Sequence, residues 1–430
     1  MRGLTSVRSL RRKGSMTSLQ ENGDRDFLLR LLPEFLQACR AESYLPAHLA
    51  PLSGKKVGLI ALGKAAPDMM QVALRHLEPH HGGILVARHG EEISLDNIQS
   101  IGASHPVPDQ SSMKAAQAIC RYLQELPDGL PVVFLLSGGA SSMACLPVEG
   151  MGLDEKAALS RKLMHAGADI HELNVIRRAY SQFKGGGMLG HARGPVYSFV
   201  LSDVPGDDPA IIGSGPSWPE CSHGSSDGSF GNPLPILKKF GIDAPKVTPA
   251  KKAISAWPHS YKIVATPKNL LSRVEEYLGH HGWEVTNLGD REEGCPNEMA
   301  ARHLDLFMRP TSANMAIISG GEASAKVTGN GVGGPNREFV LEVMLEARRR
   351  ALTGSLTVFS IDTDGVDGGN DVAGGILCMS ECRSEAWAQQ ASLALKSSDS
   401  GGFLDHFDAS IRTGPTGTNL NDLRILLWRP

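Results

Sequence analysis

The stretch KVGLIALGKAAPDMMQVALRH, residues 56–76, joins an apolar β-rich run to a helical pattern through a Gly-Lys turn. The run at 56–62 is almost continuously apolar, which is typical of a strand whose two faces are both covered. The pattern at 67–76 predicts a helix. Strand–turn–helix units of this kind recur along the chain. They predict an α/β fold, with two α/β domains whose parallel or mixed sheets are flanked by helices.

The other predicted elements continue this alternation. Further strands are expected at 83–87, 132–136, 196–201, 261–265, 284–288, 315–319, 356–361 and 423–428. Further helices are expected at 109–126, 154–168, 171–183, 269–281, 297–309, 336–350 and 384–395. Asp109 is a candidate N-cap. Weak patterning near 240–260 separates an N-terminal domain at 25–250 from a C-terminal domain at 251–430, and residues 1–24 are expected to be a disordered tail.

Composition excludes several classes of protein. The chain has 430 residues, of which 41% are hydrophobic and 21% charged, as in ordinary globular proteins. The net charge of −3 leaves no basic field for nucleic acid, and no apolar run reaches the roughly 20 residues of a membrane span. The seven cysteines include no CxxC pair. Dispersed thiols favour a reducing, cytoplasmic compartment.

Small and charged residues follow several predicted strands, at the edge where α/β sheets bind ligands. Lys64 stands on the turn after 56–62, where its side chain and a helix dipole can hold one anion together. The run at 137–142 leaves backbone N–H groups free to form an anion-binding nest. Its candidate contacts are Ser137, Gly138, Gly139, Ser141 and Ser142. A solvated lysine and an ordinary tight turn are the alternatives.

Two further clusters belong to the first half of the chain. Arg177 and Lys184 form a cationic feature on a helix and at the Gly-rich turn that follows it. A solvated helix face would explain this feature equally well. Asp203 and Asp207 follow the strand at 196–201, where carboxylates could hold a metal, orient a hydroxyl group or cap a helix.

The second half carries a glycine-rich loop and an acidic loop. The loop at 329–334 contains a literal GxGxxG, which is a weak signal for a dinucleotide and fits a loop over phosphates better. Candidate contacts around it are Glu322, Gly331, Gly333, Gly334 and Asn336. Asp364 and Asp367 fit Mg²⁺, which takes only one or two protein carboxylates beside phosphate oxygens; an Asp/Gly turn is the alternative. Thr416 and Asn419 are candidate substrate contacts.

These loops together favour one kind of chemistry. Anion-binding loops and an acidic loop occur without a GxSxG or HExxH motif. Phosphoryl transfer needs positioning and charge neutralisation rather than a nucleophilic side chain. The sequence therefore predicts phosphoryl transfer to or from a small polar acid.

Seven motifs, in order along residues 25–430, closely resemble the glycerate 2-kinase family, whose C-terminal part is the MOFRL region and whose older label is hydroxypyruvate reductase. The first four are LGKAAPDM at 62–69, LLSGGASSM at 135–143, NVIRRAYSQFKGGG at 174–187 and LSDVPGDDPAIIGSGP at 201–216. The last three are ISGGEASAKVTGNGVGGPNREF at 318–339, SIDTDGVDGGNDVAG at 360–374 and TGPTGTNLNDL at 413–423.

The resemblance implies two α/β domains with the active site in the cleft between them, and ATP- and Mg²⁺-dependent phosphorylation of D-glycerate at the 2-hydroxyl. Lys64 matches the family's active-site lysine. Members usually have GRGGRNQE where this chain has GVGGPNRE at 331–338. Val332 and Pro335 thus stand where the family has arginines. Arg337, in place of a glutamine, is expected to supply the missing charge.

On this interpretation Lys64 and Arg337 stabilise the charge on the transferring phosphoryl group. Asp203 or Asp207 orients the attacking hydroxyl. The expected partner is a small molecule, D-glycerate, without nucleic acid or membrane, and the oligomeric state is left open, with a homodimer as one option.

The phosphate donor is expected to lie on the loops at 137–142 and 329–334, with Mg²⁺ on Asp364 and Asp367. Two other interpretations stay open. One is a hydroxypyruvate reductase that uses NAD(P)H at the GxGxxG. The other is a metabolite-binding relative whose altered loop has lost catalysis.

Overall fold

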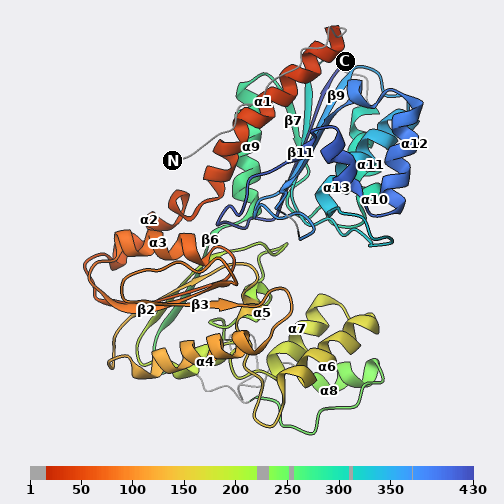
Figure 1. Cartoon of the computed structure of the whole chain (residues 1–430). Coiled ribbons are helices and arrows are strands. Elements are labelled where there is room, and N and C mark those ends of the chain that lie inside the picture. The colour runs from red at the N-terminus through yellow and green to blue at the C-terminus, as the bar shows by residue number, and fades with distance from the viewer. Residues whose placement is uncertain (1–15, 220–231, 251–255, 309–312, 370) are drawn as a thin grey trace. The chain divides into compact units, whose positions relative to one another are not determined.

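The computed structural model describes residues 16–219, 232–250, 256–308, 313–369 and 371–430. They divide into two compact units (Figure 1). The parallel-sheet unit contains Phe35–Arg273 and Pro415–Asn421, and the mixed-sheet unit contains Met1–Glu34, Val274–Gly414 and Asp422–Pro430. Each unit has one six-stranded sheet. The α/β class with parallel or mixed sheets flanked by helices is therefore confirmed.

The parallel-sheet unit has the strand order β3-β2-β1-β4-β5-β6, and all its neighbouring strands run parallel. The strands are β1 (Val57–Leu62), β2 (His80–Arg88), β3 (Ile98–Ala103), β4 (Val132–Leu136), β5 (Val196–Leu201) and β6 (His259–Ala265). Every residue of β1 and β4 is buried, as their apolar runs predict. The sequence does not predict β3, because its run IQSIGA is only partly apolar and only partly buried.

Helices α3 (Ala66–His76) and α4 (Gln110–Glu125) cover opposite faces of this sheet (Figure 1). Asp109 caps α4 as predicted, because its carboxylate accepts the N–H of Ser111 at 2.8 Å. The shorter helices are α2 (Leu45–Leu49), α5 (Ala140–Met143), α6 (Leu153–His165), α7 (Ile170–Ala179) and α8 (Pro233–Lys239). Helices α6, α7 and α8 share a hydrophobic core of their own.

The mixed-sheet unit has the strand order β11-β10-β9-β12-β8-β7. The strands are β7 (Glu284–Asn287), β8 (Met315–Ser319), β9 (Ser355–Asp362), β10 (Gly374–Cys378), β11 (Ser410–Ile411) and β12 (Asp422–Arg429). Strands β7 and β8 pair in parallel, whereas the other neighbours are antiparallel. The last strand of the chain, β12, lies between β9 and β8 and is buried almost throughout.

Helices flank the mixed sheet on both faces (Figure 1). Helices α11 (Pro335–Arg349) and α12 (Glu385–Lys396) lie on one face, and α1 (Met16–Cys39) and α9 (Pro267–His280) lie on the other. Two further helices are α10 (Pro296–Asp305) and α13 (Ser400–His406). The main core of the unit joins residues from α10, α11 and α12 to the strands.

The division between the two units differs from the expected domain boundary at residue 250. It falls within α9, between Arg273 and Val274. The physical reason is that β6 pairs with β5 and completes the parallel sheet. The chain also returns to the parallel-sheet unit over 415–421 before it forms β12.

The start of the chain also differs from the expected tail over residues 1–24. Residues 1–15 lie outside the described residues, but the helix α1 begins at Met16. Glu21 of this helix is buried and accepts hydrogen bonds from the backbone N–H groups of Leu356 and Ser380, at 3.3 and 2.8 Å. These contacts explain why this polar segment is helical.

In the part of the chain that the structure describes, no helix is long and apolar enough to cross a membrane.

Candidate active site

The parallel sheet has a topological switch point between β1 and β4, where doubly wound sheets bind ligands. The loops after these two strands contact each other. The N–H of Lys64 donates to the carbonyl oxygen of Gly138 at 2.9 Å, and the N–H of Ala65 donates to Ser137 Oγ at 3.0 Å. The structure therefore brings together two groups that the sequence singles out, the Lys64 turn and the run at 137–142.

Glycine is required in both loops, because other atoms lie where a β-carbon would be. A Cβ on Gly63, whose φ is +124°, would lie 2.4 Å from Ser137 Oγ. A Cβ on Gly138 would lie 1.8 Å from Asp203 Oδ2 and 2.4 Å from Asn419 Nδ2. The absence of a side chain on Gly138 thus lets the Asp203 carboxylate approach the backbone directly after β4.

Asp203 follows β5, and two amide side chains from the 415–421 segment hold it. Asn419 Nδ2 donates to Asp203 Oδ2 at 2.6 Å. Asn421 Nδ2 donates to the main-chain carbonyl oxygen of Asp203 at 3.1 Å. Thr416 lies in the same segment, and its Oγ1 accepts a long hydrogen bond from the N–H of Thr418 at 3.4 Å. A carboxylate fixed in this way can orient a hydroxyl group and accept its proton.

Three other predicted residues of this unit lie in the segments that follow β4 and β5. Ser137 is completely buried, and its hydroxyl accepts the N–H of Ala65. Ser142 Oγ donates to the carbonyl oxygen of Gly139 at 3.0 Å. Asp207 has a φ of +56°, and its buried Oδ1 has no hydrogen-bond partner among the described residues. Both serines therefore contribute hydrogen bonds that shape the loop at 137–142.

Lys184 is buried instead of lying on a solvated helix face. Its Nζ donates to Ser141 Oγ at 2.5 Å and also to the Ser141 carbonyl oxygen. Burial lowers the pKa of Lys184 to about 7, and the nearby cations Lys156 and Arg177 contribute in the same direction. The cationic feature predicted from the sequence is thus a group of adjacent basic side chains beside the loop after β4.

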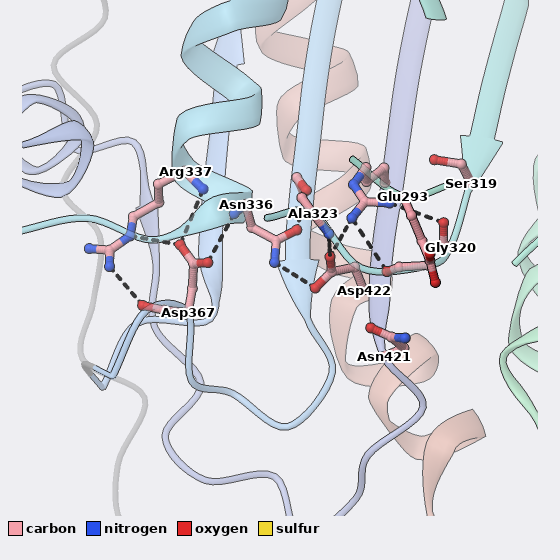
Figure 2. Close-up of polar contacts among 12 residues, drawn as sticks. Glu293, Ser319, Gly320, Ala323, Asn336, Arg337, Asp367, Asn421 and Asp422 are labelled. Atoms are coloured by element: carbon pink, nitrogen blue, oxygen red, sulfur yellow. Dashed lines mark hydrogen bonds and ion pairs between the residues drawn. The ribbon is translucent and has the colours of Figure 1, made fainter. Parts of the chain in front are cut away.

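In the mixed-sheet unit, a chain of buried polar side chains extends from α11 to β12 (Figure 2). Arg337 is 0% exposed, and its Nε donates to Asp367 Oδ2 at 2.9 Å. The backbone N–H groups of Asn336 and Arg337 donate to the same carboxylate at 2.9 and 3.1 Å. Asp367 therefore satisfies the first turn of α11 and neutralises Arg337.

This arrangement differs from the roles that the sequence suggests for Arg337 and Asp367. A completely buried guanidinium that is bound to a carboxylate has no surface with which to contact a phosphoryl group. In this structure Arg337 is thus paired with a carboxylate of its own unit instead of facing a ligand. Of the two positions where those arginines belong, Val332 is 50% exposed and Pro335 begins α11.

The same chain of side chains continues through Asn336. Its Nδ2 donates to Asp422 Oδ1 at 2.7 Å, and its Oδ1 accepts the hydroxyl of Ser360. Arg424 is also bound to the Asp422 carboxylate, and its Nη1 donates to the carbonyl oxygen of Gly320 at 3.0 Å. Burial raises the pKa of Asp422, while Arg424 opposes this shift. Asn336 thus links two buried ion pairs.

The glycine-rich loop at 329–334 packs against the turn that follows α12. A Cβ on Gly331 would lie 2.3 Å from the Cβ of Asp399, and one on Gly333 would lie 2.5 Å from Ser400 Oγ. A Cβ on Gly334 would lie 2.3 Å from Asp367 Cγ. Residues 320–334 form no strand, although a dinucleotide fingerprint requires one before its glycines. The loop therefore does not have the structure of a dinucleotide site.

The two aspartates predicted to hold Mg²⁺ do not form a metal centre by themselves. Asp364 Oδ1 accepts the N–H of Val366 at 2.8 Å, and Asp367 is bound as described above. Glu322 is exposed. Within the described ranges, no group of three or more His, Cys, Asp or Glu side chains could hold a metal ion. These donors do not fit a resident metal. They are compatible with an ion that enters together with phosphate ligands.

Sequence reasoning misses two members of the buried chain, Asp422 and Arg424. The available signal is the run LRILLW at 423–428, in which one arginine interrupts an otherwise apolar strand. A charged residue at such a position is buried only if it is paired. Asp422, two residues earlier, supplies that pairing.

Comparisons with known proteins cover both units. Residues 28–252 match a family model described as a domain of unknown function (DUF4147), and residues 315–422 match the MOFRL family. The chain is 34% identical to the D-glycerate 2-kinase of Thermotoga maritima, over 92% of this chain and 96% of that protein. It is 31% identical to the glycerate kinase of Mus musculus, over 76% of this chain and 73% of that protein. The crystal structure of the Thermotoga maritima glycerate kinase matches with a TM-score of 0.81 at 30% identity, covering 95% of this chain and 100% of that one.

Proposed function

The chain belongs to the glycerate 2-kinase family, and from this premise we propose that it transfers the γ-phosphoryl group of ATP to the 2-hydroxyl of D-glycerate. The hydroxyl oxygen forms a bond to the γ-phosphorus, and the bond from that phosphorus to the β–γ bridging oxygen breaks. ADP leaves, and the hydroxyl proton passes to a carboxylate. Mg²⁺ that enters together with the triphosphate would neutralise part of the phosphate charge.

The observation that carries this proposal is the contact between the Lys64 turn and the Gly138 loop at the switch point, with the Asp203 carboxylate against Gly138. Lys64 supplies positive charge to the transferring phosphoryl group, whose oxygens carry negative charge. Asp203 orients the acceptor hydroxyl and takes its proton, because Asn419 fixes one of its oxygens. Both residues lie in the loops that directly follow strands, Lys64 after β1 and Asp203 after β5.

Arg337 and Asp367 act as positioning residues in this proposal. Their ion pair is buried, and Asp367 also binds the first backbone N–H groups of α11. This fixes the point at which the glycine-rich loop enters the helix. The loop is the part of the mixed-sheet unit that carries the family's cationic positions, 332 and 335.

The direct test is a reaction of the purified protein with D-glycerate, ATP and Mg²⁺, followed by ³¹P NMR. The expected product is 2-phosphoglycerate, formed together with an equal amount of ADP. Formation of 3-phosphoglycerate would contradict the assignment of the acceptor hydroxyl. Loss of ATP without any phosphoglycerate would contradict the assignment of the acceptor acid.

A further inference from the structure

We propose that a pocket of the parallel-sheet unit, between the loop at 105–108 and helices α6 and α7, binds the phosphate chain of the nucleotide donor. The pocket has a volume of about 290 Å³. Gly139 and Ser141 line it directly after β4, so it begins beside the Lys64 and Asp203 site. The inference rests on the proposed function, because it assigns a place to the donor of that reaction.

The pocket concentrates positive charge. Its lining includes five basic side chains and no carboxylate; the basic residues are His105, Lys156, Arg161, Arg177 and Lys184. Two of them are almost completely buried, Lys156 at 6% and Lys184 at 3% exposure. Burial of a cation without a counter-charge is unfavourable. A bound polyanion would therefore neutralise charge that the protein itself leaves uncompensated.

The hydrogen bonds of the two lysines are made to neutral groups. Lys156 Nζ donates to the carbonyl oxygens of Arg177 and Tyr180, at 3.1 and 2.7 Å. Lys184 Nζ donates to the hydroxyl and carbonyl oxygens of Ser141. These contacts fix the directions of both ammonium groups without cancelling their charge. In the described part of the chain, Arg161 and Arg177 likewise form no ion pair with a carboxylate. Such pre-oriented cations are suited to phosphate oxygens.

The charge of the pocket fits the donor better than the acceptor. D-glycerate carries one negative charge, whereas a triphosphate chain carries about four, which matches four formally cationic side chains and a histidine. The rim is apolar, since Val107 and Met164 line the pocket and are 58% and 47% exposed. Exposed apolar side chains beside buried cations suit a ligand with a flat base at one end and phosphates at the other.

The charge state of the lysines gives the pocket a measurable signature. Burial lowers the pKa of Lys156 to about 8 and that of Lys184 to about 7. Arg177 lowers both pKa values, and Cys145 raises both; His105 and Arg161 complete the titratable and charged groups that line the pocket. A bound polyanion favours the protonated amines. Binding at pH 8 should therefore be accompanied by proton uptake. The number of protons taken up can be measured by calorimetric titration in two buffers of different ionisation enthalpy.

The test uses inorganic tripolyphosphate as the probe, with calorimetric titration of the whole protein. The expected result is one site that ATP competes for, together with proton uptake at pH 8. Arg177→Gln and, separately, Arg161→Gln should weaken tripolyphosphate and ATP binding at least tenfold and raise KM for ATP, with KM for D-glycerate changed less than twofold. Both side chains are partly or fully exposed, so these variants should fold. Lys162→Gln is the matched control, because Lys162 is an exposed cation of α6 that does not line the pocket.

The outcomes separate this inference from the proposed function. Tripolyphosphate binding that Arg177→Gln weakens, in a protein that forms no 2-phosphoglycerate, would support the pocket and overturn the activity. Turnover with unchanged ATP and tripolyphosphate binding in both arginine variants would overturn the pocket and leave the activity standing. An increase in KM for D-glycerate alone would assign the pocket to the acceptor and overturn the inference.

Discussion

Asn419 Nδ2 donates a 2.6 Å hydrogen bond to Asp203 Oδ2, although 216 residues separate the two in the chain. Both atoms lie against Gly138, where any side chain would displace them. The bond holds one oxygen of the Asp203 carboxylate in place. Because it depends on the space above Gly138, that glycine controls the orientation of Asp203.

Gly138→Ala should therefore abolish most of the activity. The added Cβ would overlap both Asp203 Oδ2 and Asn419 Nδ2, so the carboxylate must move, and a shift of about 1 Å at a reacting group costs roughly a hundredfold in rate. We expect kcat to fall by about that factor. Gly279→Ala is the control, since nothing lies within 4 Å of its Cβ in α9, and it should stabilise the protein by about 0.4–1 kcal/mol. Normal turnover by Gly138→Ala would remove Asp203 from the proposed chemistry.

Lys64→Met should reduce kcat by about 10²–10³-fold, the usual effect of removing one charge-stabilising group from a transition state. The backbone contact between Lys64 and Gly138 does not involve the side chain, so the melting temperature should remain close to that of the wild type. Lys55→Met, which changes an exposed lysine just before β1, should leave kcat unchanged. Equal losses in both variants would show that the effect is not specific to the switch point.

The sequence predicts those parts of the fold and site that depend on local pattern and on strand order. The apolar runs of β1 and β4 identify a parallel sheet, and the rule that ligands bind at strand ends joins the Lys64 turn to the loop at 137–142. Strand β3 is missed because it is half polar. The expected boundary near residue 250 differs from the observed division because local pattern does not show that the predicted strand at 261–265 pairs with β5.

Contacts between distant segments could not be predicted in this way. Spacing along the chain does not indicate that Asn419 meets Asp203 or that Asp367 meets Arg337. Charge by itself does not distinguish an arginine that faces a ligand from one that neutralises a buried carboxylate. The glycines at 331–334 present the same difficulty, because their close contacts are with residues 367 and 399–400 of the same unit.

Asp367→Ala should lower the free energy of unfolding by about 3–5 kcal/mol, because it leaves Arg337 buried without its counter-charge. It also removes the acceptor for the first N–H groups of α11. Urea denaturation measures this loss of unfolding free energy.

The double variant Asp367→Ala, Arg337→Met should recover part of the lost stability, since no unpaired charge remains. Asp405→Ala, in an exposed pair with Arg412, should cost far less. Similar losses in Asp367→Ala and Asp405→Ala would contradict the structural role of Asp367.

Glu338 should make the protein less stable as the pH rises. Burial, together with repulsion from Glu342 and Asp367, raises the pKa of Glu338 from an ordinary 4.5 to about 7. Between these two values the folded chain binds more protons than the unfolded chain, so its stability falls with increasing pH. Glu338→Gln should therefore raise the melting temperature at pH 8 and leave it nearly unchanged at pH 4. Glu276→Gln, at an exposed position of α9, should show no such difference, and the same response in both variants would exclude Glu338 as its source.

Pro335→Arg should increase kcat if, as the family resemblance implies, a cation at this position takes part in the reaction, because Arg337 is buried and paired with Asp367. Residue 335 is the first of α11, and a helix start tolerates many residues besides proline. One added charge-stabilising contact of about 1.4 kcal/mol in the transition state corresponds to a tenfold rise in kcat. Pro335→Gln removes the proline without adding charge and serves as the control. A rise confined to the arginine variant would show that the present loop lacks a catalytic charge. Equal rates in the two variants would contradict a catalytic role for a cation at position 335.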